Sequence, residues 1–180
     1  MKMKNWVGVL LCVSAGFAAF AADSPVFHMP FDETAEVILA DGTTAKGIVY
    51  GKEIYDAGIV GRALNIKRHA YDQVTCVNFK GPSSVNLTQG TASFWLKPTW
   101  NFHDGAKHDL FRLACEGGFG MSLVKTDKDI LDLSVRAPKQ TQILSTVEMK
   151  ADQWIHVAIT WDMTSGRCVL YANGDRLKEV

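Results

Sequence analysis

The loop from Pro98 to His108, PTWNFHDGAKH, holds the densest group of side chains that could recognise a ligand. Its aromatic, imidazole and carboxylate groups come from Trp100, Phe102, His103, Asp104 and His108. Aromatic rings offer a flat apolar face to the C–H groups of a sugar, and neighbouring polar groups can bind its hydroxyls. We therefore name Trp100, His103, Asp104 and His108 as candidate ligand-binding residues. The alternative is that Trp100 and Phe102 fold back and cover the sheet.

The remaining histidines do not form a catalytic motif. His28 and His156 fall in strand-like runs, and His69 falls in or near a loop. The sequence has no Gly-x-Ser-x-Gly nucleophile elbow, so no motif supports a Ser-His-Asp hydrolase. The spacing of the residues alone leaves a Ser-His-Asp arrangement open.

Three cysteines lie beyond the first 22 residues: Cys76, Cys115 and Cys168. They are far apart and show no C-x-x-C spacing, which argues against a zinc site. In an oxidising compartment, one disulfide with one free thiol, or no disulfide, are both open. Each cysteine sits in an apolar run, so we expect buried, inert thiols.

The N-terminal segment has the three regions of a secretory signal peptide. Two lysines precede an apolar stretch from Trp6 to Phe20, and Ala19-Phe20-Ala21 supplies the small-x-small pattern of a cleavage site. The apolar stretch is shorter than the ~20 residues that span a bilayer, so we expect no permanent membrane anchor. We interpret residues 1–22 as a cleaved signal and residues 23–180 as one domain that is secreted, periplasmic or on the cell surface.

The charge of the domain argues against nucleic acid as a partner. Removal of Lys2 and Lys4 with the signal reduces the 19 basic residues to 17, against 19 acidic residues. The basic residues are also scattered, whereas nucleic-acid binding surfaces concentrate them.

Short runs of alternating apolar and polar residues recur along the chain, separated by Gly, Asp, Asn, Pro and Ser, which is typical of an antiparallel all-β domain. The runs are Val26–Met29, Gly47–Tyr50, Ala63–Ile66, Thr75–Phe79, Thr91–Lys97, Asp109–Cys115, Gly120–Lys125, Ile130–Arg136, Gln142–Val147, Trp154–Trp161 and Cys168–Ala172. Thr91–Lys97 and Trp154–Trp161 carry bulky groups on both faces, so each is covered on both sides or lines a groove. Two antiparallel sheets packed as a jelly-roll sandwich fit this pattern best.

Five stretches, in order, resemble the laminin-G-like, concanavalin A-like jelly-roll modules of secreted bacterial proteins. They are HMPFDE (28–33), GIVGRALNI (58–66), GTASFWLKPTW (90–100), DQWIHVAITWD (152–162) and LYANGDRL (170–177). The resemblance implies a β-sandwich that binds an extracellular polysaccharide or glycoprotein. It also places His156 in a core strand, as a hydrogen-bonded structural imidazole. A structural calcium ion near the first strand is implied too, with Asp32 as the candidate ligand, because hard cations take carboxylate oxygens.

The same sandwich occurs in laminarinase-type endoglucanases, which use a Glu-x-Asp-x-x-Glu strand and, when retaining, place two carboxyl groups about 5–5.5 Å apart. The nearest string is DKDILD, with Asp127, Asp129 and Asp132. Its spacing matches, but Asp is one methylene shorter than Glu, and the first two residues fall in a polar turn. We therefore predict no catalysis. A divergent glycan hydrolase is the alternative, and a structural or adhesive domain of a larger surface protein is another.

The last run, Asp175–Val180, follows Asn173-Gly174, which is a strong hairpin signal. Modules of the resembled family usually continue with several more strands, one of which pairs beside the first strand, and nothing like that segment occurs in this sequence. We therefore expect a sandwich that lacks its last strands, and poor folding or aggregation of residues 23–180 in isolation.

Overall fold

In the computed structural model of this protein, every regular element is a β-strand, for the residues that it describes: 12–14, 27–50, 52–66, 76–78, 88–114, 120–136 and 140–180. No helix that could span a membrane occurs among these residues. The strands form two large sheets and two small ones, and all pairings are antiparallel. This confirms the all-β, two-sheet antiparallel sandwich that the alternating pattern predicts.

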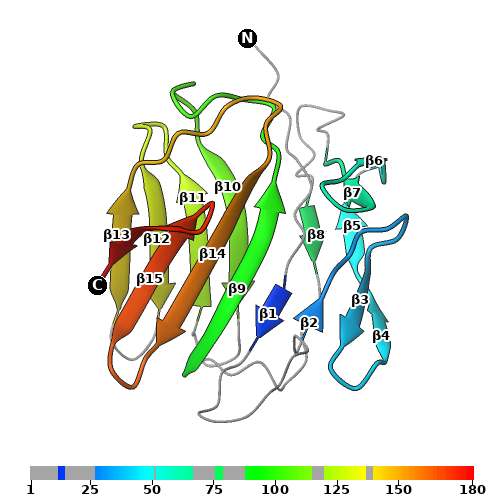
Figure 1. The fold of residues 1–180 in the computed structure, drawn as a ribbon, viewed down its shortest axis with the longest axis horizontal. Coiled ribbons are helices and arrows are strands. Elements are labelled where there is room, and N and C mark those ends of the chain that lie inside the picture. Colours follow the sequence, from blue (N-terminus) through cyan, green and yellow to red (C-terminus); the bar gives the residue numbers. More distant parts are fainter. Residues whose placement is uncertain are drawn as a thin grey trace.

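The larger sheet has eight strands in the order β16-β15-β14-β9-β1-β2-β3-β4 (Figure 1). In that order they are Asp175–Glu179, Arg167–Ala172, Ile155–Asp162, Gln89–Leu96, Cys12–Ser14, Phe27–His28, Glu36–Leu39 and Thr44–Lys46. The second sheet has the order β10-β11-β12-β13, with strands His108–Ala114, Gly120–Lys125, Leu131–Arg136 and Thr141–Ser145. Two short pairs complete the fold: β5 (Ile48–Tyr50) with β8 (Cys76–Asn78), and β6 (Tyr55–Ala57) with β7 (Arg62–Leu64).

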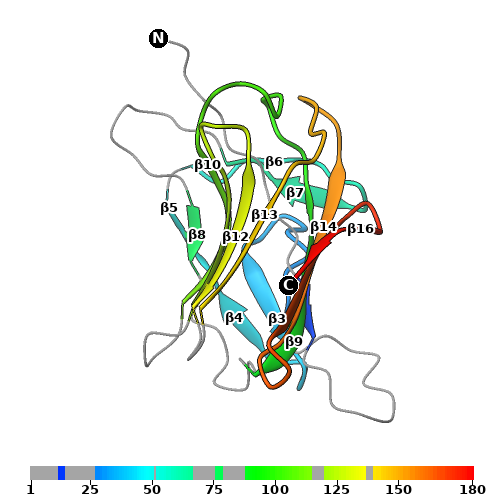
Figure 2. The same cartoon turned by 90° about the vertical axis from the view of Figure 1, so that its left-hand side faces the viewer.

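The core lies between the two large sheets, which Figure 2 shows face to face. On β14 the alternation buries Ile155, Val157, Ile159 and Trp161, each at most 4% exposed. Leu123 and Leu133 face them from the second sheet and are fully buried. Phe94 of β9 stacks on Phe111 of β10 across the layers, with ring centroids 5.8 Å apart. Each fully buried side chain of this size contributes about 1.5–3 kcal/mol, so the facing apolar rows hold the sheets together.

All eleven strand-like runs named from the sequence contain or overlap a strand, and β16 occupies the run after Asn173-Gly174. Asn173 and Gly174 have φ of 50° and 87°, as a tight hairpin turn with two left-handed residues requires. Strands β3, β4 and β6 were not predicted. They are only three or four residues long, too short for a periodic pattern to stand out, and they depend on pairing with a neighbour.

Strand β1 lies inside the predicted signal peptide and pairs with β2 on one side and β9 on the other. The rest of residues 1–26, including the predicted cleavage site, lies outside the described residues. Cleavage therefore remains a prediction. Cys115 lies outside them as well, while Cys76 and Cys168 are free thiols. Cys168 is fully buried, as expected, and burial raises the pKa of its thiol to about 11.

Candidate functional site

The loop between β9 and β10, which the sequence marks as a ligand-binding candidate, packs against the protein. Trp100 is 8% exposed, Phe102 is 1% exposed and His108 is fully buried. The indole of Trp100 stacks on the imidazole of His108 with ring centroids 4.0 Å apart and an interplanar angle of 8°. The backbone N–H of Phe102 donates to the carbonyl of Met149, 2.8 Å away, which ties the loop to the connection before β14.

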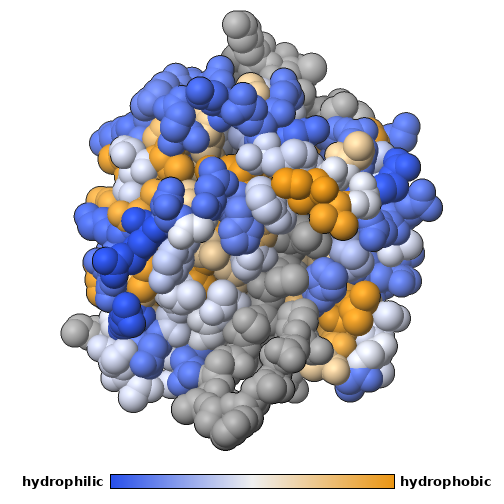
Figure 3. All heavy atoms as spheres, in the orientation of Figure 1, coloured by the Kyte–Doolittle hydropathy of each residue, from blue (hydrophilic) through white to orange (hydrophobic). Residues whose placement is uncertain are grey.

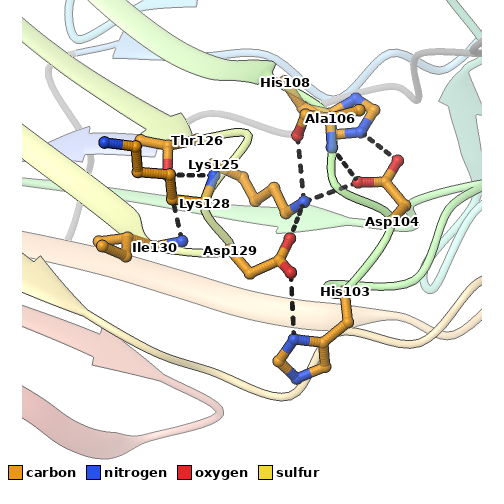
Figure 4. Close-up of polar contacts among 9 residues, drawn as sticks. All are labelled: His103, Asp104, Ala106, His108, Lys125, Thr126, Lys128, Asp129 and Ile130. Carbon is orange, nitrogen blue, oxygen red and sulfur yellow. Dashed lines mark hydrogen bonds and ion pairs between the residues drawn. The ribbon is translucent and has the colours of Figure 1, made fainter.

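A buried lysine from the neighbouring hairpin holds this loop in place (Figure 4). Lys125, the last residue of β11, has a fully buried side chain. Its Nζ donates to Oδ1 of Asp104 and to Oδ1 of Asp129, both at 2.6 Å, and to the carbonyl of Ala106 at 3.0 Å. An ammonium has three N–H donors, so each one has an acceptor. We call Lys125, Asp104 and Asp129 the lysine lock.

The lysine lock includes one of the four candidate residues, Asp104, and contacts two others, His108 and His103. His108 Nε2 lies 2.8 Å from Oδ2 of Asp104, and His103 Nδ1 lies 3.4 Å from Oδ2 of Asp129. Burial alone would raise the pKa of Asp104, but hydrogen bonds from Lys125, His108 and the Ala106 N–H lower it to about 2. The hydrogen bond from Lys125 likewise lowers the pKa of Asp129. Both carboxylates are therefore ionised at neutral pH and balance the ammonium.

These contacts correspond to the alternative in which Trp100 and Phe102 cover the sheet. An exposed aromatic face on Trp100 was the premise for ligand binding, and burial of the ring contradicts that premise. Asp104 and His108 bind each other instead, and of the four candidates only His103 is largely exposed, with 68% of its side chain accessible. Ligand binding by this loop stays an untested prediction.

Asp32, the candidate calcium ligand, lies in the turn between β2 and β3. Its Oδ1 accepts a hydrogen bond of 2.8 Å from the backbone N–H of Arg62 on β7, and the Arg62 guanidinium lies 3.6 Å from Glu33. Within the described ranges, no three His, Cys, Asp or Glu side chains are grouped so that they could hold a metal ion. The carboxylate of Asp32 thus ties two hairpins together, and a calcium ion at this position stays an untested prediction.

The carboxylates of the DKDILD string are engaged in separate contacts. Asp127 and Asp129 lie in the turn between β11 and β12, as expected, and Asp129 belongs to the lysine lock. Asp132 lies on β12, where it accepts hydrogen bonds from Ser134 Oγ at 3.0 Å and from Gln142 Nε2 at 3.0 and 3.1 Å. The turn position of two of the three carboxylates weighs against a nucleophile and a general acid arranged along one strand.

A second candidate surface is the outer face of the larger sheet. Alternation along β9, β14 and β15 places one set of partly exposed side chains on this face: Thr91, Ser93, Trp95, His156, Ala158, Thr160 and Tyr171. The register aligns them in rows, with Trp95 opposite His156, and Ser93 opposite Ala158 and then Tyr171. In Figure 3, which looks onto this side of the molecule, hydrophilic residues cover much of the surface and apolar residues form separate patches.

One end of this face carries a compact group that we call the aromatic end: Trp95, Lys97, Trp154 and His156, all half-buried. The ring centroids of Trp95 and His156 are 5.0 Å apart, and the Lys97 ammonium lies 5.4 Å from the centroid of the Trp154 ring. Ser93 Oγ and His156 Nε2 share a hydrogen bond of 2.7 Å. Burial lowers the pKa of His156 below its usual 6.5, so the imidazole is neutral at pH 7. His156 is thus a hydrogen-bonded imidazole, as predicted, but it lies on the outer face and not in the core.

The other end of the face has a small hollow of about 140 Å³, lined by Thr160, Trp161, Asp162, Arg167, Val169 and Tyr171. Pockets that enclose a small molecule usually measure ~300–1,000 Å³, so this hollow is too small to enclose one. A ligand on this face would lie along an open surface, as a polymer chain can. In the sequence, Trp95 and Trp154 already alternate with the apolar residues that face the core. This alternation could have identified the outer face as a candidate binding surface.

The family model of the concanavalin A-like lectin/glucanases superfamily matches residues 70–179, more than half of the chain. The chain belongs to that superfamily. No curated protein and no solved structure matches the chain significantly. The superfamily groups lectins with glucanases, so membership is compatible with a carbohydrate-binding β-sandwich and leaves the choice between binding and hydrolysis to the site itself.

Proposed function

We propose that this domain is a non-catalytic module, exported by its signal peptide, that binds extracellular carbohydrate on the outer face of the larger sheet. The observation that carries the proposal is the aromatic end, where two half-buried indoles stand on a rigid sheet next to hydroxyl and imidazole groups. Aromatic faces stack on sugar C–H groups, and side chains such as Ser93 and His156 can bind sugar hydroxyls. The ligand would be a polysaccharide or the glycan of a glycoprotein, in the periplasm, in the medium or at the cell surface.

Hydrolysis is the weaker reading because the carboxylates that could act are occupied. Lys125 holds Asp129, and Ser134 and Gln142 hold Asp132. We expect no release of reducing sugar from β-glucans. Release that is abolished by Asp132→Asn would show that the domain is a hydrolase after all.

A glycan array with the purified secreted domain, with and without calcium, tests the binding function directly. Trp95→Ala should weaken every array hit by about threefold to tenfold, the equivalent of ~0.5–1.5 kcal/mol for an aromatic contact. Tyr50→Ala is the matched control, because Tyr50 is an aromatic residue on β5 that is 47% exposed and belongs to a different sheet. Binding that is unaffected by Trp95→Ala in a folded protein would place the site elsewhere, and an array without hits would favour a structural or adhesive role.

A further inference from the structure

The ammonium of Lys97 is the feature of the aromatic end that a neutral sugar would leave unused. We infer that the sugar bound at this end carries a negative charge, a carboxylate or a sulfate, which pairs with Lys97. This inference rests on the proposed carbohydrate binding. Lys97 would then decide the charge specificity of the site.

Three observations place the Lys97 ammonium in a ligand-binding position. It lies over the Trp154 ring, an arrangement that favours a cation because the ring face is electron-rich. The Lys97 side chain is half-buried, so part of its hydration shell has been lost. Lys97 directly follows the last residue of β9, and the continued alternation places its side chain on the same side as Trp95, two residues earlier.

Three charged residues on this side of the sheet pair with one another, whereas Lys97 contacts the Trp154 ring and has no counter-ion among the described residues. Glu179 Oε1 lies 2.5 Å from Arg167 Nε, and its Oε2 lies 2.6 Å from Arg176. Lys125, the other lysine of the described residues that is not exposed, contacts two carboxylates. No carboxylate of the described residues lies within ion-pairing distance of Lys97. A half-buried cation without a counter-charge binds an anion more strongly than a fully hydrated one.

The dimensions of the aromatic end suit a single charged sugar with its neighbour. Lys97 directly follows β9 and is two residues beyond Trp95, about 7 Å along an extended backbone. His156 lies directly opposite Trp95 on β14, and neighbouring strands are ~5 Å apart. A sugar ring on Trp95 can therefore place a ring substituent at the Lys97 ammonium while its hydroxyls reach Ser93 and His156. Because His156 is neutral at pH 7, Lys97 supplies the positive charge of this group.

Polysaccharides that share a sugar backbone but differ in charge separate the effect of the ligand's charge from that of its sugar backbone. The probes are hydroxyethyl cellulose, carboxymethyl cellulose and cellulose sulfate, with dextran, carboxymethyl dextran and dextran sulfate as a second backbone, together with the acidic and neutral members of the glycan array. We expect acidic ligands to bind at least about tenfold more tightly than neutral ligands on the same backbone. Comparison of the carboxymethyl and sulfate arms shows which anion the site accepts.

The Lys97→Gln variant should lose this preference, and Lys97→Arg should retain it. Lys46→Gln is the control, because Lys46 is an exposed lysine on β4 at the far edge of the same sheet and its removal changes the net charge equally. Equal binding of acidic and neutral ligands, or a preference that survives Lys97→Gln, would overturn the inference and leave the proposed function standing. If no glycan of either kind binds, the proposed function fails and the inference fails with it.

Discussion

Replacement of Lys125 by Met should destabilise the domain by removing the centre of the lysine lock. Met keeps most of the side-chain stem but deletes the ammonium, so Asp104, Asp129 and the carbonyl of Ala106 lose their shared donor. Removing one partner from a fully buried ion pair typically costs ~3–5 kcal/mol. The two carboxylates keep 20% and 26% of their side-chain surface exposed and can regain some hydration. We therefore expect the lower end of that range, about 3 kcal/mol.

The assay is urea unfolding followed by tryptophan fluorescence and circular dichroism. Lys128→Met is the matched control, because Lys128 is an exposed lysine in the same turn, and we expect its midpoint to stay near that of the parent protein. A second variant, Lys125→Met with Asp129→Asn, removes one of the two stranded charges and should recover part of the loss.

Two results would refute this reasoning. If Lys125→Met shifts the midpoint no more than Lys128→Met does, the lysine lock contributes nothing measurable. If the added Asp129→Asn substitution deepens the loss, the cost does not come from unpaired carboxylates but from the packing of the lysine stem.

Three further outcomes follow from the geometry of the loop and the hairpins. Trp100→Ala should cost about 3–5 kcal/mol in urea unfolding, since a buried indole is lost, and an unchanged midpoint would contradict its covering role. The pKa of Asp104 is about 2 in the folded state and 3.8 in the unfolded chain, so the unfolded chain binds a proton at a higher pH. The resulting stability is complete above about pH 4 and is lost as the pH falls toward 2; a melting profile of Asp104→Asn with the same slope in this window would disprove it. Gly61→Ala should cost well over 1 kcal/mol, because φ is +59° and a Cβ would collide with the Asp32 carboxylate. Gly42→Ala is its control, with φ of +80° and open space around it, and equal melting temperatures for the two variants would remove the argument for the collision.

Much of the larger sheet could be predicted from alternation because its strands are long and half-buried. On β9 and β14 each inward position is apolar, so a period of two identifies both the strand and its buried face. The short strands β3, β4 and β6 could not be predicted in this way. Their pairing depends on a neighbouring strand, and a run of three or four residues is too short for a period to show.

The candidate binding loop shows what spacing cannot decide. The sequence determined that Trp100, His103, Asp104 and His108 lie on one connection, but the direction of each side chain depends on a partner elsewhere in the chain. Lys125 is 21 residues beyond Asp104 and becomes its neighbour only when the β11–β12 turn is brought beside the loop. Two carboxylates and a buried ammonium then favour one arrangement strongly, since an unpaired charge in that position would be costly.

The sequence by itself therefore determined the all-β class, the faces of the long strands and the presence of tryptophans opposite the core. Local periodicity carries these properties, because they follow from the alternation of side chains along an extended backbone. Tertiary structure alone decided which aromatic residues are covered and which remain accessible. Trp100 is buried and stacks on His108, which Asp104 of the lysine lock holds, whereas Trp95 stays half-exposed beside His156. Burial is set by contacts between segments distant in the chain, which no local pattern records.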